Sequence, residues 1–426
     1  AFTACFAVWT IFSIIGVQIK ADLNLTEAQF GLLVGTPILT GSLSRIFLGV
    51  WTGQFGGRIV NLVVMVLAAA ATFLLSYAET YTQFLVAALG VGLAGGAFAV
   101  GVAYVSKFYP ANRQGTALGI FGAGNVGAAV TKFAAPFVML ALGWEAVAQV
   151  WAGALLVIAI LAFLLTRDEP EIAERRRTGQ KPVTAWMQLT PLKDIRVWRF
   201  SLYYFFVFGG FVALALWLPH YLTGAYGLGI GAAGMLAAAY SIPGSLFRVF
   251  GGWLSDRIGA RKVMYLTFAL SAVCTFILAY PATTYVVDGI QGPIQFRLAL
   301  SLPAFVVLVF ILGFAMSLGK AAVYKHIPVY YPDHVGAVGG LVGMIGGLGG
   351  FILPIAFGAL NDLTGVWTSC FMLLFLLVFG ALIWMHLAVR RMEHRRTPDL
   401  ATLPEFPELA GVGPDRATAA ASPRSS

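Results

Sequence analysis

Two arginines stand in the middle of apolar segments, where a charge is costly. Arg45 lies within GSLSRIFLG and Arg248 within GSLFRVFGG. A charge in hydrocarbon costs about 2.5–3.5 kcal/mol on insertion scales, so an arginine there indicates a functional site. The guanidinium group is planar, permanently charged and able to donate paired hydrogen bonds to a planar oxyanion. The two arginines therefore predict an anion-binding site.

The acidic residues strengthen this prediction by their positions. The chain has 18 Asp and Glu residues, and none falls at the centre of an apolar segment. We therefore expect the substrate itself to supply the missing negative charge. In the alternative, each arginine caps backbone carbonyls or extends to an interface. The equivalent mid-segment positions of the two arginines disfavour that alternative, and a cation carrier would need carboxylates in the membrane.

The composition excludes a soluble protein. The 426 residues are 59% hydrophobic and 11% charged, whereas soluble domains carry about 25% charged residues. The net charge of +9 comes from Lys and Arg between apolar runs, as in proteins of the lipid bilayer, so we expect no nucleic-acid partner. Cys5, Cys274 and Cys370 lie inside apolar segments and predict small buried side chains rather than disulfides.

Twelve apolar segments are long enough to span a bilayer and predict an all-α polytopic membrane protein. They cover 2–19, 28–51, 60–77, 83–106, 115–140, 145–166, 198–223, 230–254, 262–280, 297–320, 335–360 and 367–389. Six belong to an N-terminal bundle (1–166) and six to a C-terminal bundle (198–389), separated by a polar cytoplasmic linker (167–197). The tail at 390–426 has no periodic apolar face and is expected to be disordered. Because the chain starts at Ala1 inside an apolar run, we expect that residues precede it.

Loop charges predict the orientation in the cytoplasmic membrane. With the basic linker in the cytoplasm, both termini are cytoplasmic, and most basic loop residues share that side. These are Arg58, Lys107, Arg113, Arg257, Arg261, Lys262 and the Arg390–Arg396 cluster. The opposite side holds Lys20 and Arg297.

The two halves repeat in sequence. Residues 44–58 (SRIFLGVWTGQFGGR) align with 247–261 (FRVFGGWLSDRIGAR) at a constant offset that matches Arg45 with Arg248. The same offset matches Gly56 with Gly259. Equivalent positions in two six-helix halves are typical of a duplicated transporter, so we predict pseudo-symmetric halves.

The second copy of this repeat resembles the loop motif of the major facilitator superfamily. The motif has the form Gly-x-x-x-Asp-Arg-x-Gly-x-Arg, and its residues here are Gly252, Asp256, Arg257, Gly259 and Arg261. The resemblance implies a gating motif whose charge pair forms in one state and breaks in another. The first copy has Gly53 and Gln54 where Asp and Arg are expected, so we predict a weaker latch there.

Two glycine-rich runs form a second constellation. They are GTALGIFGAGNVGAAVTKFAAP (115–136) and GAVGGLVGMIGGLGGFILP (336–354). Such glycine spacing permits close helix packing and also exposes backbone to a small ligand. Asn125, in the first run, can hydrogen-bond an oxygen atom.

With the mid-segment arginines, these runs resemble the nitrate/nitrite porters (NarK-type) of the major facilitator superfamily. Both runs match that family's nitrate signatures, and GLLVGTPILTGSLSRIFLG (31–49) resembles its second helix. The resemblance covers all twelve spans and implies that substrate lies between the arginines, sandwiched by aromatic rings. Carried onto this sequence, the implied substrate-binding residues are Arg45, Arg248, Phe6, Phe98, Tyr204, Phe208, Asn125 and Gly124.

We therefore expect a secondary transporter that moves nitrate, and also nitrite, by alternating access. The segment GKAAVYKHIPVYYP (319–332) resembles the subgroup that imports nitrate with protons, so proton-coupled uptake is the first hypothesis. Nitrate/nitrite exchange and transport of another small anion remain alternatives. His326 is a possible proton carrier, more simply read as an interface residue. Lys132 and Lys320 could tune the field around the site, and the alternative for Lys132 is that it only reaches an interface.

We expect no enzymatic activity, because a nucleophile–base pair and a metal cluster are both missing from the pattern. His220, His334, His386 and His394 lack ligand spacing, so no metal or cofactor is predicted. The expected partners are nitrate, nitrite, protons and the lipid bilayer, and the expected assembly is a monomer.

Overall fold

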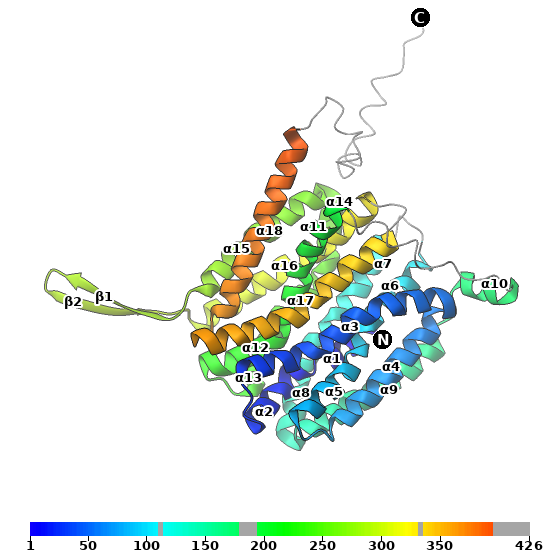
Figure 1. Ribbon diagram of the computed structural model, residues 1–426, viewed down its shortest axis with the longest axis horizontal. Helices are drawn as coiled ribbons and strands as arrows, with labels where there is room; N and C mark the ends of the chain where they lie inside the picture. The colour runs from blue at the N-terminus through cyan, green and yellow to red at the C-terminus, as the bar shows by residue number, and fades with distance from the viewer. Residues whose placement is uncertain (110–113, 179–193, 331–334, 395–426) are drawn as a thin grey trace, which may run out of the picture.

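The computed structural model describes residues 1–109, 114–178, 194–330 and 335–394. These residues form a bundle of long helices and one β-hairpin (Figure 1). Ten helices, with an eleventh segment made of a bent pair, are long and apolar enough to cross a membrane. The remaining predicted span, 28–51, lies within the 29-residue helix α3. The predicted all-α class is confirmed. Arg113, His334 and the predicted tail from residue 395 onward lie outside the described residues.

The N-terminal half contributes six spans, several of them interrupted. They are α1 (Phe2–Trp9) with α2 (Phe12–Asp22), α3 (Glu27–Phe55), α4 (Gly57–Leu75), α5 (Tyr81–Val91) with α6 (Leu93–Ser106), α7 (Gln114–Gly122) with η1 (Ala123–Val126) and α8 (Gly127–Leu142), and α9 (Trp144–Leu165). A short helix, α10 (Pro170–Thr178), follows and projects from the bundle in Figure 1.

The C-terminal half has the same plan with one addition. Its helices are α11 (Ile195–Tyr204) with η3 (Phe205–Gly210) and α12 (Phe211–Tyr226), α13 (Ile230–Leu246) with α14 (Arg248–Ile258), α15 (Ala260–Ala279), α16 (Leu302–Tyr330), α17 (Val335–Thr364) and α18 (Ser369–His394). The addition is an antiparallel hairpin of β1 (Thr283–Gly289) and β2 (Gly292–Leu298), which extends away from the bundle (Figure 1).

The interruptions of the helices coincide with residues predicted for the site. Asn125 lies in the 3-10 turn η1, and Phe208 lies in the π-helical turn η3. Arg248 is the first residue after the break between α13 and α14, where the axis bends by 40°. Irregular turns inside otherwise regular helices free backbone groups and re-aim side chains, and they are frequent at functional sites.

The helix bounds in the structure differ from the predicted ones between residues 281 and 330. The prediction began the tenth span at 297, but residues 292–298 form a strand and α16 begins at Leu302. The β-branched and aromatic residues of TTYVVDG (283–289), the alternation of Ile-Gln-Phe-Arg-Leu (294–298) and the Gly-Ile-Gln-Gly turn between them favour the hairpin. The helix α16 also continues to Tyr330, well past the predicted end at 320. Lys320 therefore lies inside the helix rather than at its end, and its side chain is fully buried.

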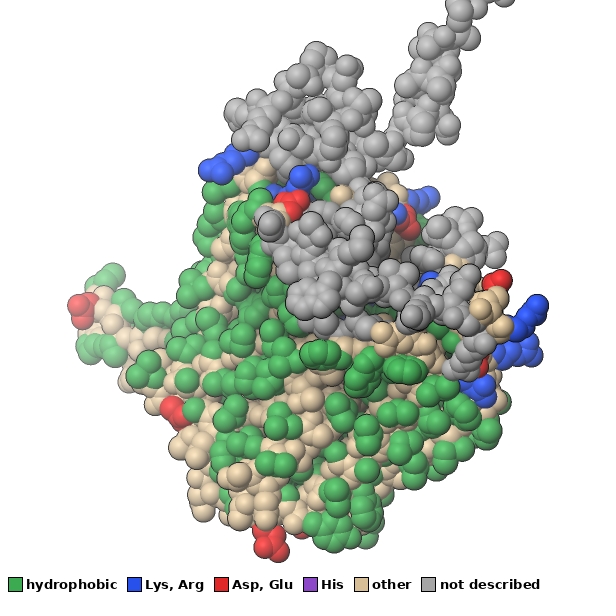
Figure 2. Space-filling model, turned by 45° about the vertical axis from the view of Figure 1, so that its right-hand side comes forward, with side chains coloured by type: hydrophobic (Ala, Val, Ile, Leu, Met, Phe, Trp, Pro, Cys, Tyr) green, Lys and Arg blue, Asp and Glu red, His purple; other side chains and the backbone are tan. Residues whose placement is uncertain are grey.

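The two halves meet along long helix contacts, most extensively between α3 and α17, which lie side by side in Figure 1. The outward surfaces are apolar: Phe47, Leu140 and Leu165 are among the exposed side chains, as expected for contact with lipid. Figure 2 shows this apolar face with Lys and Arg gathered toward one end, where Asp and Glu also occur, while the opposite end shows Asp and Glu alone. We call the end with Arg58 and Arg257 the basic end, and the end with Glu27 and Asp362 the acidic end.

Candidate anion-binding site

Arg45 projects from the middle of α3 toward the opposite half. Its side chain is buried, and Nη1 donates a hydrogen bond to the carbonyl oxygen of Gly343 in α17 at 2.9 Å. Its Nε and Nη2 atoms have no hydrogen-bond partner among the described residues. Because buried polar groups are normally hydrogen-bonded, these two donors point to a ligand.

Arg248 occupies the equivalent place in the C-terminal half. It is also buried, and its Nη1 likewise has no partner in the described chain. Its charge and that of Arg45 act on each other unfavourably. No Asp or Glu within the described residues forms an ion pair with either arginine. The site thus holds two buried like charges without a protein counter-ion, which favours binding of an anion.

Each glycine-rich run covers the arginine of the other half. A Cβ added at Gly122, in the first run, would lie 3.0 Å from the guanidinium of Arg248. A Cβ added at Gly347, in the second run, would lie 3.3 Å from Nη1 of Arg45. The close helix approach predicted for these runs is therefore present, and it brings bare backbone against both cations.

Phe98 of α6 lies between the two arginines. Its ring centroid is 5.3 Å from Cζ of Arg45 and 5.7 Å from Cζ of Arg248. The ring of Phe208 faces Phe98 at 6.5 Å with an interplanar angle of 27°. Non-bonded atoms pack at roughly 3.5 Å, so a flat ion stacked between two parallel rings needs about 7 Å between them, slightly more than this centroid distance. Phe208 is also 5.3 Å from Cζ of Arg45.

Tyr204 and Asn125 complete the predicted polar lining. Tyr204 stacks on Phe208 at 5.0 Å and 7°, and its buried hydroxyl has no hydrogen-bond partner in the described part of the chain. The side-chain amide of Asn125 is fully buried, and neither its nitrogen nor its oxygen has a partner there. Both residues can therefore donate to an anion without first breaking a protein hydrogen bond.

Two predicted residues do not face the arginines directly. Phe6 packs edge-on against Phe2 and Trp9, at 5.8 and 5.3 Å. A Cβ added at Gly124 would lie 2.5 Å from the ring of Phe2, so this glycine serves the close approach of η1 and α1. These contacts describe support of the site rather than contact with a bound ion.

Sequence reasoning missed two aromatic residues that do face the cations. The ring of Trp9 lies 5.5 Å from Cζ of Arg45, while its Nε1 donates to the carbonyl oxygen of Pro37. The ring of Tyr324 lies 5.7 Å from Cζ of Arg248 and meets Tyr204 edge-on at 5.0 Å. Helical spacing could have found both, because Trp9 lies three residues after Phe6 and Tyr324 lies four after Lys320.

The gating motif forms its charge contacts within the C-terminal half. Asp256 pairs with Lys325 of α16, and Cζ of Arg257 lies 4.9 Å from the ring centroid of Trp253. Gly259, at φ +89°, makes the sharp turn between α14 and α15, a conformation that favours glycine. Nothing lies within 4 Å of a Cβ added at Gly252.

The equivalent loop of the N-terminal half has the same turn but a different acid. Gly56 adopts φ +91°, as its counterpart does. With Gly53 and Gln54 in the motif positions, the carboxylate comes from Glu169 after α9, which accepts a hydrogen bond from the backbone N–H of Gly57 at 2.7 Å. A buried acceptor at a helix N-terminus stabilises that helix.

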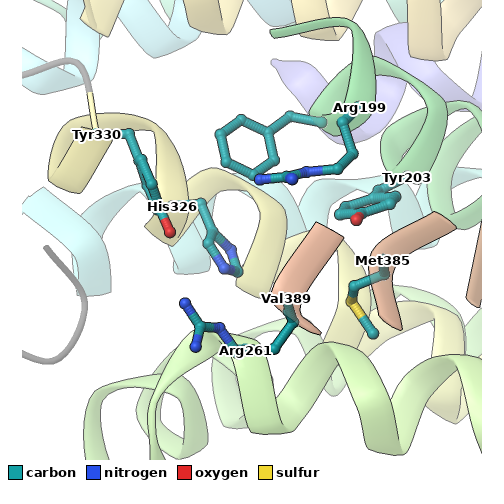
Figure 3. A pocket seen from close by; sticks show the side chains of 8 residues that line it. Arg199, Tyr203, Arg261, His326, Tyr330, Met385 and Val389 are labelled. Carbon is teal, nitrogen blue, oxygen red and sulfur yellow. The ribbon is translucent and has the colours of Figure 1, made fainter. Parts of the chain in front are cut away.

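Arg261, the last motif residue, lines a small cavity at the basic end. Arg199, Tyr203, His326 and Tyr330 surround the same cavity, as Figure 3 shows. His326 is buried there and shares a hydrogen bond with the carbonyl oxygen of Ala322 at 2.8 Å. This histidine lies in that cavity and not beside Arg45 or Arg248.

The acidic end is closed by contacts between the halves. The Asp362 carboxylate of α17 accepts hydrogen bonds from the backbone N–H groups of Glu27 and Ala28, at 3.1 and 2.9 Å. The Glu27 carboxylate contacts Lys20 at 3.1 Å and His220 at 2.6 Å. Burial raises the pKa of Glu27, but His220 and Lys20 outweigh it, so the net shift is below the ordinary value of 4.5.

Comparisons with known proteins give a consistent picture. The sequence family described as Major Facilitator Superfamily matches residues 1–287 and 221–411. The chain is 40% identical over 415 residues to the "Probable nitrate/nitrite antiporter NarK1" of Thermus thermophilus, covering 94% of this chain and 92% of the relative. It is 31% identical to the "Nitrite extrusion protein" of Bacillus subtilis (strain 168), covering 92% and 93%.

Further matches extend this picture to another relative and to solved structures. The "Probable nitrate transporter NarT" of Staphylococcus carnosus is 30% identical, covering 89% of this chain and 91% of the relative. A bacterial homologue of the human lysosomal transporter Spinster, in an inward-facing and occupied conformation, superposes with a TM-score of 0.68 at 16% identity, covering 93% of this chain and 96% of that chain. That structure supports the fold alone.

Proposed function

Because this chain belongs to the nitrate/nitrite porter (NarK-type) family of the major facilitator superfamily, we propose that it carries nitrate, and also nitrite, across a membrane by alternating access. The family consists of transporters, so the chain is not an enzyme. The observation that carries the proposal is the pair of buried guanidinium groups, Arg45 and Arg248, with open donors and no carboxylate partner in the described chain.

The geometry suits a small planar anion. Nitrate is flat and spreads its charge over three oxygens, so it can accept hydrogen bonds in its plane from the arginines while its faces contact rings. Phe98 and Phe208 offer ring faces 6.5 Å apart, and Tyr204 and Asn125 add hydrogen-bond donors. A carrier for a larger carboxylate would need a wider space between the rings.

Alternating access follows from the electrostatics of this arrangement. The two arginines belong to opposite halves and repel each other, so an empty site resists closure. A bound anion offsets the repulsion and lets the halves close around it. The acidic end is closed through Asp362 and Glu27.

Proton-coupled uptake of nitrate is our first proposal for the coupling. The resemblance of 319–332 to the proton-coupled subgroup supports it. So does Lys320, the buried lysine of this segment, on which the charge of Arg248 acts. Exchange of nitrate for nitrite is the second candidate, favoured by the printed name of the Thermus relative. We propose the cytoplasmic membrane as the location, with both termini in the cytoplasm and a monomer as the working unit.

The test is nitrate uptake into proteoliposomes that contain purified protein. Uptake is measured with and without an inward proton gradient, and with and without nitrite inside. We expect the gradient to drive nitrate into nitrite-free vesicles. Uptake that needs internal nitrite and ignores the gradient would establish exchange instead. If nitrate moves under neither condition while formate or acetate does, the substrate assignment is wrong.

A further inference from the structure

We propose that Lys320 is the group that binds the coupled proton and that it does so without any carboxylate. This proposal rests on the proposed proton-coupled transport and names the residue responsible for the coupling. In the loaded state Lys320 is an ammonium beside Arg248, while nitrate lies between the arginines. In the empty state it is a neutral amine. The step is only a proton transfer from water on one side and back to water on the other.

The surroundings of Lys320 are apolar and neutral. Its side chain is fully buried in α16, and Nζ lies 3.4 Å from the ring centroid of Phe211. Nζ also donates a hydrogen bond to the carbonyl oxygen of Gly244. That carbonyl stands one helical turn before Arg248, close to the break between α13 and α14. A ring face and a carbonyl both accept an ammonium, yet neither carries the formal negative charge that would hold it permanently.

Several elements that pack on α16 carry charged or hydroxyl-bearing side chains. The α14 helix contributes Arg248, whose positive charge acts on Lys320 unfavourably. From α13 comes Tyr240, whose hydroxyl donates to the sulfur of Met316. Tyr324 lies on α16 itself, and Tyr204 comes from α11. From α15, Thr267 and Ser271 present buried hydroxyls without a partner among the described residues.

No acidic side chain from the described residues contacts Lys320. Asp256 of α14, which packs on α16, pairs with Lys325 instead. Burial and a neighbouring cation both disfavour a further positive charge in this place. The arrival of an anion at Arg248 cancels the neighbouring charge, so the anion and the proton each raise the affinity for the other.

This linkage is what symport of an anion with a proton requires. The empty site carries the charges of two arginines, and the loaded site carries those charges, one added proton and one nitrate. Both forms have the same net charge. The loaded carrier and the returning empty carrier therefore move the same charge through the membrane when they change conformation. A site with the proton but without nitrate has three positive charges and closes least easily.

Lys132 provides a matched control in the other half. It is also a fully buried lysine, and its Nζ donates to the carbonyl oxygen of Ala128 on its own helix α8, at 3.1 Å. Unlike Lys320, it shows no ring contact within the described residues and no electrostatic action of either arginine. A generic effect of removing a buried lysine should therefore follow from substitution of Lys320 or of Lys132. Loss of proton coupling should follow from substitution of Lys320 alone.

The experiment compares wild type, Lys320→Gln and Lys132→Gln in proteoliposomes. A tenfold proton gradient can drive up to about tenfold nitrate accumulation by one-to-one symport. We expect accumulation by wild type and Lys132→Gln. Lys320→Gln should equilibrate nitrate without accumulating it and should keep nitrate/nitrite exchange within about threefold of wild type. Accumulation by Lys320→Gln at the wild-type level overturns the role of Lys320.

Two further results separate the failure of this inference from the failure of the proposed function. If wild type exchanges nitrate for nitrite but ignores the gradient, proton coupling itself is wrong and the inference falls with it. If wild type and both variants accumulate nitrate, transport is proton-coupled and only the assignment to Lys320 is wrong.

A binding measurement keeps the test independent of transport. Nitrate is added to purified protein in weakly buffered solution with a pH indicator. Wild type should take up protons with nitrate, at most one per nitrate bound, and the uptake should be largest between the pH of half-protonation of the empty site and that of the nitrate-loaded site, because the two ligands are linked. Lys132→Gln should behave alike, and Lys320→Gln should take up almost none. Equal proton uptake by Lys320→Gln and wild type overturns the proposal even if the variant transports poorly.

Discussion

The two halves of the bundle each bury a mid-span arginine, Arg45 or Arg248, and a lysine, but they pair them differently. In the C-terminal half, Lys320 donates to the carbonyl of Gly244, one helical turn before Arg248, and lies within the electrostatic reach of that arginine. In the N-terminal half, Lys132 donates to the carbonyl of Ala128 on its own helix, and among the described residues it shows no electrostatic action of Arg45. The arginines therefore follow the pseudo-symmetry, and the lysines break it.

This difference separates two tasks that a coupled carrier must perform. Recognition of a planar anion needs cations from both sides, so the duplicated arginines suit it. Coupling to a proton needs one titratable group that responds to the anion, and one copy is enough. A similar asymmetry occurs at the basic end, where the motif acid Asp256 in one half is replaced by Glu169 in the other.

Substitution of the arginines is the largest change expected. Arg45→Lys and Arg248→Lys keep the charge but lose paired, planar hydrogen bonding. Loss of a hydrogen bond to a charged group costs about 1.5–3 kcal/mol, so nitrate uptake should fall roughly 10- to 150-fold in either variant. Arg58→Lys, outside the site, is the control. Near-normal uptake by one lysine variant would show that the halves do not share recognition.

Phe98 from the N-terminal half and Phe208 from the C-terminal half should contribute differently to nitrate affinity. Phe98 lies within 5.7 Å of both guanidinium groups, whereas Phe208 has only Arg45 in such contact. With about 0.5–2 kcal/mol per cation–π contact, Phe98→Leu should raise KM for nitrate about tenfold and Phe208→Leu about threefold. Phe276→Leu, on the exposed surface, is the matched control. Uptake kinetics that rank Phe208 above Phe98 would contradict the arrangement.

At the acidic end, Asp362→Asn should weaken closure. The carboxylate caps the N-terminus of α3 from the other half, and such a cap contributes about 1 kcal/mol. We expect the acidic end to open more often, measured as the labelling rate of a cysteine introduced at Ile38, which is buried in α3 beside Gly350 of α17. Asp22→Asn, at the same end and hydrogen-bonded to Gln18, should leave the rate unchanged. Equal labelling of all three proteins would mean that the cap does not contribute to closure.

A smaller effect should follow from pH at the same end. Because the pKa of Glu27 lies below its ordinary value of 4.5, its ion pairs stabilise closure above that value and lose this contribution as the pH falls through the lowered pKa. Spin-label distances between α3 and α17 should therefore lengthen in acid. The Glu27→Gln variant should lose this dependence, and an unchanged pH profile in that variant would contradict the role of Glu27.

Much of the fold and the central charges could be predicted from the sequence, because long apolar segments and buried charges are strong signals in a membrane protein. Arg45, Arg248, Phe98 and Phe208 do come together as predicted. The depth of Lys320 could not be predicted, since the helix end at Tyr330 depends on packing rather than on hydropathy.

The aromatic residue of the first span that contacts Arg45 differs from the predicted one. Phe6 and Trp9 lie three residues apart on α1, so helical spacing allows either, and in the structure the ring of Trp9 lies 5.5 Å from Cζ of Arg45. The hairpin at 283–298 was missed because its alternating pattern directly precedes a long apolar run. The structure thus differs from the prediction where tertiary contacts, rather than the local sequence, decide the conformation.

The central claim is that one anion binds between Arg45 and Arg248. The most direct test is a crystal structure of the protein grown with nitrate, compared with one grown without it. We expect planar density between the rings of Phe98 and Phe208, within hydrogen-bond distance of both guanidinium groups. Nitrate density elsewhere, with this space unchanged between the two crystals, would contradict the account.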